Sequence, residues 1–224
     1  MGRYIEEVYK DNATRQMLEY VRDRLKPVDD AAKSGKRFSF RSRFEHTKRV
    51  LEWALTINEK ECADAGILVV ATIFHDVGYC EYREGGDGHS KISERIFREY
   101  IGMLPADILS ANLTAQQIAE VSAVILAHSD KKLDCSLLTK EQMVLMDADL
   151  LDEAGAMRVL WECFMEAGKS QYDYVSAYKE IVKSYYELAD DFAHLHTEEG
   201  KRLHLEMQDY IRRFVEGLRT ELGQ

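Results

Sequence analysis

A histidine followed directly by an aspartate, His75-Asp76, closes an apolar run at residues 65–74. Imidazole and carboxylate groups together bind divalent transition metals, and a carboxylate can bridge two ions. Adjacent residues of a helix point about 100° apart, so these two side chains can approach one ion or two neighbouring ions. Further ligands must complete the shell, and the candidates stand far apart along the chain: His46, His89, His128 and Asp149.

Three of these candidates fall within or at the end of predicted helices. His46 lies near the start of an amphipathic segment whose apolar residues recur at helical spacing. A Thr-x-x-Gln capping box precedes each of the segments 115–128 and 140–152 and predicts that a helix begins there. His128 ends the first of these helices, and Asp149 lies in the last turn of the second.

The whole chain reads as all-α. It contains only two prolines, and no long stretch alternates apolar and polar residues as a half-buried strand would. A loop with three glycines is expected at 80–89, either as a flap over a substrate site or as a plain surface connection. Helices are expected at 3–24, 44–58, 62–77, 90–103, 106–111, 115–128, 140–152, 155–168, 171–189 and 197–222.

This ordered set of residues resembles the HD-domain superfamily of metal-dependent phosphohydrolases, and in particular its small bacterial and archaeal hydrolases without an assigned substrate. The superfamily pattern is His, then His-Asp, then Asp, and its two-metal members carry two additional histidines. The resemblance covers about residues 40–155 and implies a single helical domain over 1–224, with residues 156–224 as a C-terminal helical extension. The matching segments are 43–50 around His46, 74–78 around His75-Asp76, and 147–151, where the alignment makes Asp149 the ligand.

By this resemblance His46, His75, Asp76 and Asp149 are expected to bind a metal ion. His89 and His128 correspond to the additional histidines, which would give a second ion bridged to the first by Asp76. One or two ions remain open at this point, because His89 also reads as a solvated loop residue and His128 as a histidine favoured at a helix C-terminus. The imidazole-rich donor set favours Mn, Fe, Ni, Co or Zn over Mg or Ca.

Metal ions in such a site lower the pKa of bound water to about 7 and neutralise charge on phosphoryl oxygens. The sequence therefore predicts an enzyme that hydrolyses a phosphate ester of a small metabolite, in particular a nucleotide, by metal-activated hydroxide. Asp76 is its central residue. Arg49, Lys91 or Lys131 is expected to stabilise the transition-state charge, and Asp130 or Glu81 to assist proton transfer. Cations that flank the ligands are candidates for holding the phosphate: Arg41, Arg43, Lys48, Arg49, Lys91, Arg95, Lys131 and Lys132.

Two other functions remain open from the sequence. Some HD-domain relatives use the same six ligands to hold two irons and activate dioxygen on a diol or a hydroxyphosphonate. A metal-stabilised nucleotide sensor without turnover would also use this set of ligands.

Composition narrows the partners and the compartment. A formal net charge of −10 and a pI near 5.3 argue against binding of a polynucleotide. No run approaches the ~20 apolar residues of a membrane span, and four scattered cysteines without a paired motif favour a reducing, cytoplasmic location. An apolar stripe along 197–222 packs either into the domain or against a second copy, so a homodimer is open.

Overall fold

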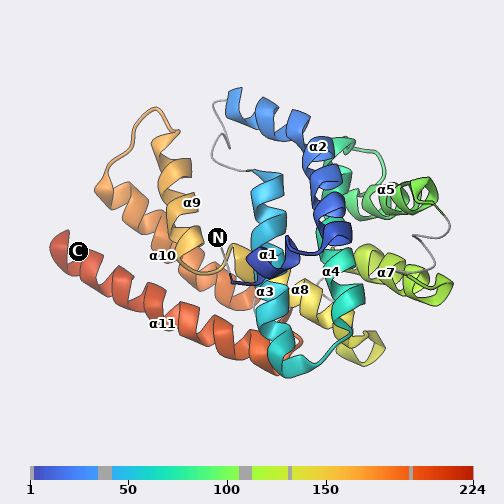
Figure 1. The fold of residues 1–224 in the computed structure, drawn as a ribbon. Helices are drawn as coiled ribbons and strands as arrows, with labels where there is room; N and C mark the ends of the chain where they lie inside the picture. The colour runs from blue at the N-terminus through green and yellow to red at the C-terminus, as the bar shows by residue number, and fades with distance from the viewer. Residues whose placement is uncertain (1–2, 35–41, 106–112, 131–132, 192–193, 224) are drawn as a thin grey trace.

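The computed structural model describes residues 3–34, 42–105, 113–130, 133–191 and 194–223, and these form helices without any strand (Figure 1). This confirms the all-α prediction. The helices are α1 (Arg3–Val8), α2 (Asn12–Ser34), α3 (Arg43–Glu61), α4 (Ala65–Phe74), the 3-10 helix η1 (Val77–Cys80), α5 (His89–Met103), α7 (Ala115–Ala127), the 3-10 helix η2 (Cys135–Leu137), α8 (Lys140–Asp152), α9 (Ala156–Ala167), α10 (Tyr174–Asp191) and α11 (Glu198–Glu221).

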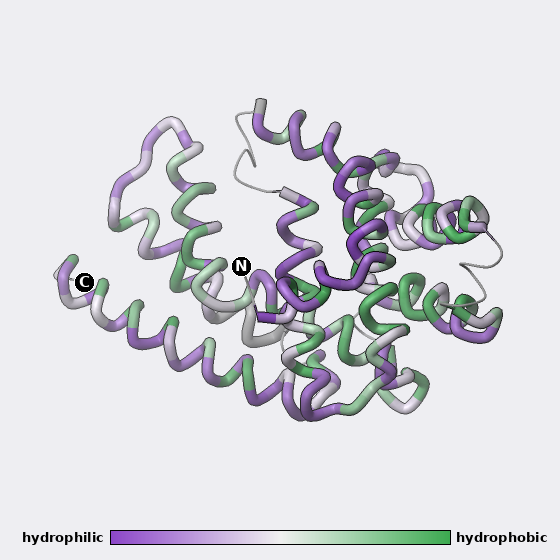
Figure 2. The backbone as a smooth tube through the Cα atoms, viewed as in Figure 1, coloured by the Kyte–Doolittle hydropathy of each residue, from purple (hydrophilic) through white to green (hydrophobic). Residues whose placement is uncertain are grey.

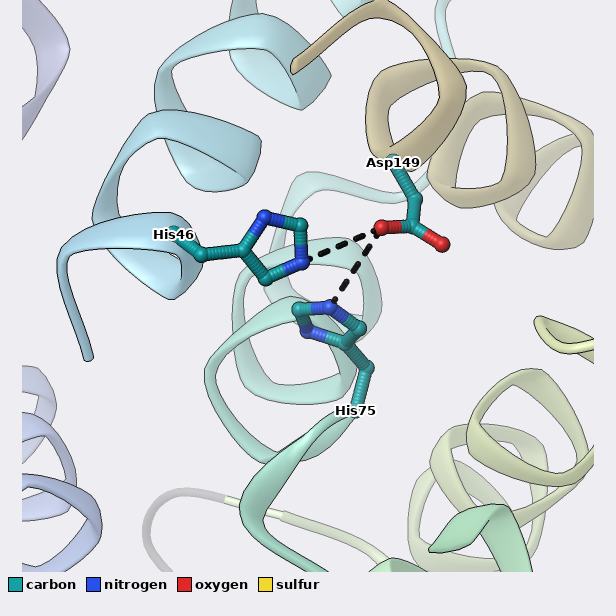
Figure 3. Close-up of side chains that lie close together, drawn as sticks. All are labelled: His46, His75 and Asp149. Atoms are coloured by element: carbon teal, nitrogen blue, oxygen red, sulfur yellow. Dashed lines mark ion pairs between the residues drawn. The ribbon is translucent and has the colours of Figure 1, made fainter. Parts of the chain in front are cut away.

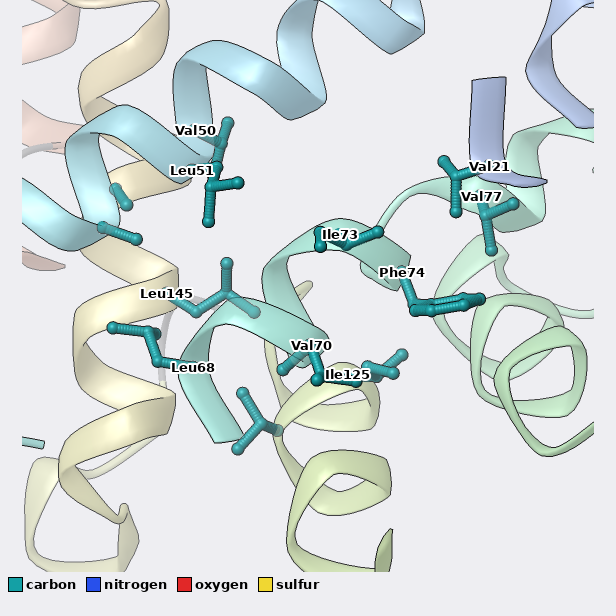
Figure 4. Close-up of a cluster of buried hydrophobic side chains, with 14 of the residues drawn as sticks. Val21, Val50, Leu51, Leu68, Val70, Ile73, Phe74, Val77, Ile125 and Leu145 are labelled. Carbon is teal, nitrogen blue, oxygen red and sulfur yellow. The ribbon is translucent and has the colours of Figure 1, made fainter. Parts of the chain in front are cut away.

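Helix α4 lies at the centre of the core. It packs against α3, α7 and α8, and its side chains Leu68, Ile73 and Phe74 are completely buried (Figure 4). A helix surrounded on all sides must be apolar on all sides, which explains its uninterrupted apolar run. Asp64 begins the helix, because its carboxylate accepts hydrogen bonds from the backbone N–H groups of Gly66 and Ile67.

Several helix boundaries differ from the sequence prediction. The helix expected at 3–24 is two helices, and α2 continues through Pro27 to Ser34. The one expected at 62–77 is shorter, because Cys62 takes a left-handed conformation that ends α3 and because α4 ends at Phe74. The segment expected at 106–111 lies outside the described residues. Both predicted capping boxes are present, at the starts of α7 and α8.

The C-terminal helix α11 is fixed to α8 by Asp147. This buried carboxylate accepts hydrogen bonds from the backbone N–H of His196, and from the backbone N–H and hydroxyl of Thr197. Gly200 is needed at the contact, since a Cβ there would lie 2.5 Å from Asp147 Oδ2. The side chain of Asp147 is therefore occupied with α11, although Asp149 stands only two residues away.

Hydropathy follows this arrangement. In Figure 2 α2 is mainly hydrophilic, α7 is mainly hydrophobic, and α11 alternates between the two along its length. Across the part of the chain that the structure describes, every helix is either too short or too polar to cross a bilayer.

Candidate metal centre

Side chains from five separate parts of the chain converge at one place. His46 of α3, His75 at the end of α4 and Asp149 of α8 offer ligand atoms that lie within 4.8 Å of one another (Figure 3). Asp76, His89 at the start of α5 and His128 at the end of α7 form a second such group. The structure therefore brings together all six metal ligands that the sequence predicts.

The carboxylate of Asp76 stands between the two groups. Its Oδ2 lies 3.4 Å from His46 Nε2 and 3.8 Å from His75 Nε2. Its Oδ1 lies 3.4 Å from His89 Nε2 and 3.5 Å from His128 Nε2. Each oxygen thus faces a different pair of imidazoles, which is the position of a bridging carboxylate.

The remaining distances within the centre are also those of ligands around cations. Asp149 Oδ1 is 3.2 Å from His46 Nε2 and 3.9 Å from His75 Nε2 (Figure 3). His75 Nε2 is fully buried and has no hydrogen-bond partner among the described residues. A buried nitrogen is costly without a partner, and a metal ion would supply one. The donor set therefore fits one or two divalent transition metals.

Two histidines are aimed by the helix ends on which they stand. The last carbonyl groups of a helix have no partner within the helix. His75 Nδ1–H donates to the Thr72 carbonyl at 2.7 Å, and His128 Nδ1–H donates to the Ile125 carbonyl at 2.6 Å. Each bond fixes the tautomer, so the lone pair on Nε2 points into the centre.

His46 is aimed by a carboxylate. Its Nδ1–H donates to Asp152 Oδ2 at 2.7 Å. Asp152 is completely buried and is held in turn by Arg49, whose Nε and Nη2 lie 2.7 and 2.9 Å from the two carboxylate oxygens. This carboxylate–imidazole arrangement is the usual second layer of support around a metal ligand.

His89 is aimed by stacking. Its ring lies parallel to that of Tyr79, with 4.5 Å between centroids, and the guanidinium of Arg43 covers Tyr79 at 3.5 Å. Arg43 Nη1 also donates to Asp76 Oδ2 at 3.1 Å. A Cβ on Gly78 would lie 2.1 Å from the His89 carbonyl oxygen, so glycine is needed where η1 meets α5.

The electrostatics of the centre favour a cation. Burial alone would raise the pKa of Asp76, but His75, His128 and His46 hold it well below its usual range. Burial alone would lower the pKa of His46, but hydrogen bonds to Asp149, Asp152 and Asp76 raise it well above its usual value. Burial lowers the pKa of His75 to about 4. The raised pKa means that His46 tends to carry a proton. Its positive charge then offsets the negative charge of the carboxylates, as a bound metal ion would.

The cations and acids predicted beside the ligands lie in different surroundings. Arg49 binds Asp152, as described above, and Lys91 is exposed on α5, two residues from His89 and so on another face of the helix. Asp130 is exposed two residues beyond His128. Glu81 forms ion pairs with Arg24 and Arg95 at the surface. Three of the flanking cations fall outside the described residues: Arg41, Lys131 and Lys132.

Sequence reasoning missed Asp152 and Tyr79. Asp152 follows Asp149 by three residues on α8, so it shares a side of the helix with a predicted ligand. Its acidic type and this spacing were the available signal. Tyr79 carried no comparable signal, since its role depends on the turn that η1 makes after the His-Asp pair.

The sequence model of the HD domain matches residues 43–154, which is half of the chain. This protein belongs to the HD-domain family. The match spans helices α3, α4, α5, α7 and α8 and all six ligand candidates. It confirms the family resemblance seen in the sequence.

Solved structures of other proteins share this fold. One is a predicted HD superfamily hydrolase from an uncultured Thermotogales bacterium, with 23% identity, a TM-score of 0.61, and coverage of 93% of this chain and 92% of that one. Another is YpgQ of Bacillus subtilis, with 20% identity, a TM-score of 0.60 and coverage of 92% of both chains. YpgQ has also been solved in complex with ADP, with 18% identity, a TM-score of 0.55, and coverage of 92% and 96%. No curated protein matches the chain.

Proposed function

We propose that this HD-domain protein is a metal-dependent phosphohydrolase that cleaves a phosphate ester of a small metabolite, in particular a nucleotide. The observation that carries this proposal is the position of Asp76, whose two oxygens face different pairs of imidazoles. His46, His75 and Asp149 would hold one ion, and His89 and His128 a second, with Asp76 between them. Such ions supply a nucleophilic hydroxide at neutral pH and neutralise charge on a phosphoryl group.

Arg43 is the cation best placed to hold the substrate phosphate. Its guanidinium lies against the Asp76 carboxylate and is fixed in orientation by the ring of Tyr79. Arginine binds phosphate through two parallel N–H groups, so a fixed guanidinium beside the metal ligands would orient the ester. Arg49 has a different role in this proposal, because it supports Asp152 and through it His46.

Proton transfer to the leaving group needs an acid at the edge of the centre. Asp130 is exposed just beyond the end of α7, two residues after His128, and we keep it as the proposed acid. Glu81 pairs with Arg24 and Arg95 at the surface, and it has no part in this proposal. Lys91 is exposed on another face of α5 and has no part in this proposal.

Two features support the nucleotide and the single domain. YpgQ, which shares the fold, binds ADP in its solved complex, so a nucleotide is a reasonable first class of substrate. Helix α11 packs on α3 and on α8, the helices that carry His46 and Asp149. We therefore propose that residues 156–224 form one domain with the metal centre.

The test is phosphate release from a panel of nucleotides and sugar phosphates by manganese-loaded protein. Asp76→Ala should lose both the bound metal and the turnover, because it removes the ligand shared by both groups. Arg43→Ala should keep the metal but lose turnover, whereas Arg98→Ala removes an exposed arginine that pairs with Glu94 on α5 and should change neither. Equal phosphate release by wild type and Asp76→Ala would reject the proposal.

The di-iron oxygenase alternative is tested with the same protein. Iron-loaded, reduced protein would consume oxygen in the presence of a polyol or a hydroxyphosphonate if it were an oxygenase. If no nucleotide or sugar phosphate released phosphate and the iron-loaded protein consumed oxygen, the oxygenase would replace the hydrolase as the proposed function.

A further inference from the structure

The two groups of ligands differ in their number and charge. The first group combines two imidazoles with two carboxylates, from His46, His75, Asp149 and, through Oδ2, Asp76. The second group also has two imidazoles, from His89 and His128, but its single carboxylate is the shared Asp76. The affinity of a metal site rises with the charge and the rigidity of its ligands. By ligand charge alone, the second group holds an ion less tightly than the first.

The second group also stands on a less firmly held part of the chain. His89 is the first residue of α5, which begins without a side-chain cap, and residues 81–88 before it are exposed. Its side chain is 21% exposed, against 4% for His46 and 0% for His75. Within the described ranges, no group accepts a hydrogen bond from its Nδ1. The orientation of this imidazole therefore depends on its stacking against Tyr79.

Ser93 fixes the two partners of this stacking relative to each other. It is completely buried, one helical turn after His89, and its hydroxyl accepts a hydrogen bond from the backbone N–H of Gly78 at 2.8 Å. Gly78 precedes Tyr79 in η1, and a Cβ on it would lie 2.7 Å from the backbone nitrogen of Ser93, so η1 and α5 are in direct contact. A buried N–H without an acceptor is costly, so this bond holds η1 against α5.

The supports of the first group lie elsewhere. His46 is held by Asp152 of α8, and His75 by the Thr72 carbonyl of α4. Neither support involves η1 or α5. A change at Ser93 should therefore reach His89 while the imidazoles of the first group stay in place.

We propose that the centre holds its two ions unequally: the first group keeps a tightly bound ion, whereas the second group binds a weaker, exchangeable ion whose affinity depends on Ser93 as a positioning residue. The inference rests on the two-metal centre of the proposed function and adds its regulation. Because the second ion exchanges, turnover would rise and fall with the concentration of free metal.

The test is a titration of metal-free protein with Mn²⁺, followed by electron paramagnetic resonance, with bound metal counted by atomic emission. Wild type should bind one ion with the spectrum of isolated Mn²⁺, and then a second, at least about tenfold more weakly, with the spectrum of an exchange-coupled pair. Ser93→Ala should weaken only the second step, by about tenfold, the lower end of the usual effect of losing a group that orients a ligand. His89→Ala should abolish the second step and keep the first.

Ser122→Ala is the matched control. Ser122 is a buried serine of α7 whose hydroxyl has no hydrogen-bond partner among the described residues, so its removal should change neither step. Ser93→Cys retains a weaker acceptor of similar shape and should cause a smaller loss than Ser93→Ala, in the same step. This variant also provides the test if Ser93→Ala does not fold.

Three results would overturn the inference: two ions of equal affinity in wild type, a single ion in wild type, or Ser93 variants that weaken both steps alike. The last result would show a general effect on folding in place of positioning. The titration contains no substrate, so the proposed hydrolysis fails separately. Two unequal ions in a protein that releases no phosphate from any ester would reject the hydrolysis and leave this inference standing.

Discussion

Asp152 offers the sharpest test of how the centre is supported. Its buried carboxylate accepts three hydrogen bonds, from His46 Nδ1 and from two nitrogens of Arg49. Asp152→Asn keeps the shape of the side chain but removes its charge and turns one acceptor oxygen into an NH₂ group. Either His46 or Arg49 must then face a donor, and His46 loses the negative charge that keeps its ring basic and correctly oriented.

The expected cost follows from that bond. A hydrogen bond to a charged group contributes about 1.5–3 kcal/mol when it is lost from a buried site. Loss of a carboxylate behind a metal-bound histidine weakens metal binding roughly 10- to 100-fold, which is about 1.4–2.8 kcal/mol, so the two figures agree. Arg49 adds little to this sum because its side chain is 37% exposed and water can replace the lost partner.

The assay is competition between the protein and a coloured chelator for Zn²⁺ or Mn²⁺, with circular dichroism as the check on folding. Asp147→Asn is the matched control, since Asp147 is also a buried aspartate of α8 but binds the start of α11. Asp147→Asn should lower the free energy of unfolding without reducing the affinity for the metal. A folded Asp152→Asn protein with metal affinity within about threefold of wild type would refute the role of Asp152.

Two further predictions concern the protonation of His46 and the close backbone contact at Gly78. Metal affinity should fall as the pH falls through the raised pKa of His46, about tenfold per pH unit, because the metal must displace the proton that this imidazole then carries. Calorimetry in buffers of different ionisation enthalpy counts that proton, and an affinity independent of pH between about 6 and 8 would contradict it. Gly78→Ala should reduce the metal bound per chain, measured by atomic emission, because the new Cβ must move the start of α5 and His89 with it. Gly102→Ala, in the last turn of the same helix with no described atom within 4 Å of the new Cβ, should stabilise the protein by about 0.5 kcal/mol, and equal metal loss in both variants would refute this explanation.

Many of the helices could be predicted from the sequence because the features that mark them are local. Capping boxes at the starts of α7 and α8 are formed by residues three apart, and the structure contains both. A helix was expected over 62–77, and its apolar run forms α4 at the centre of the core. Boundaries were less predictable where they depend on partners elsewhere, as at the end of α2, where Asp29 binds Ser42 and the backbone of Arg43.

The six candidate ligands were also recognisable from sequence, since residue type and order carry the chemistry of metal binding and the family resemblance supplied their grouping. The sequence could not rank the charged residues around them. Lys91 follows His89 closely along the chain, yet helical geometry turns it outward, whereas Arg43 is 33 residues from Asp76 and touches it. Proximity in sequence is a poor guide to contacts made by helices that meet only after folding.

Only the tertiary structure decided how the centre is supported and what lies beside it. His46 and Asp152 are 106 residues apart, and they meet because α3 packs along α8. A cavity beneath α9 arises in the same way, from an apolar helix face held over the start of α3 by polar contacts with α10. The sequence of a helix determines its apolar stripe, but what that stripe faces depends on how the other helices pack around it.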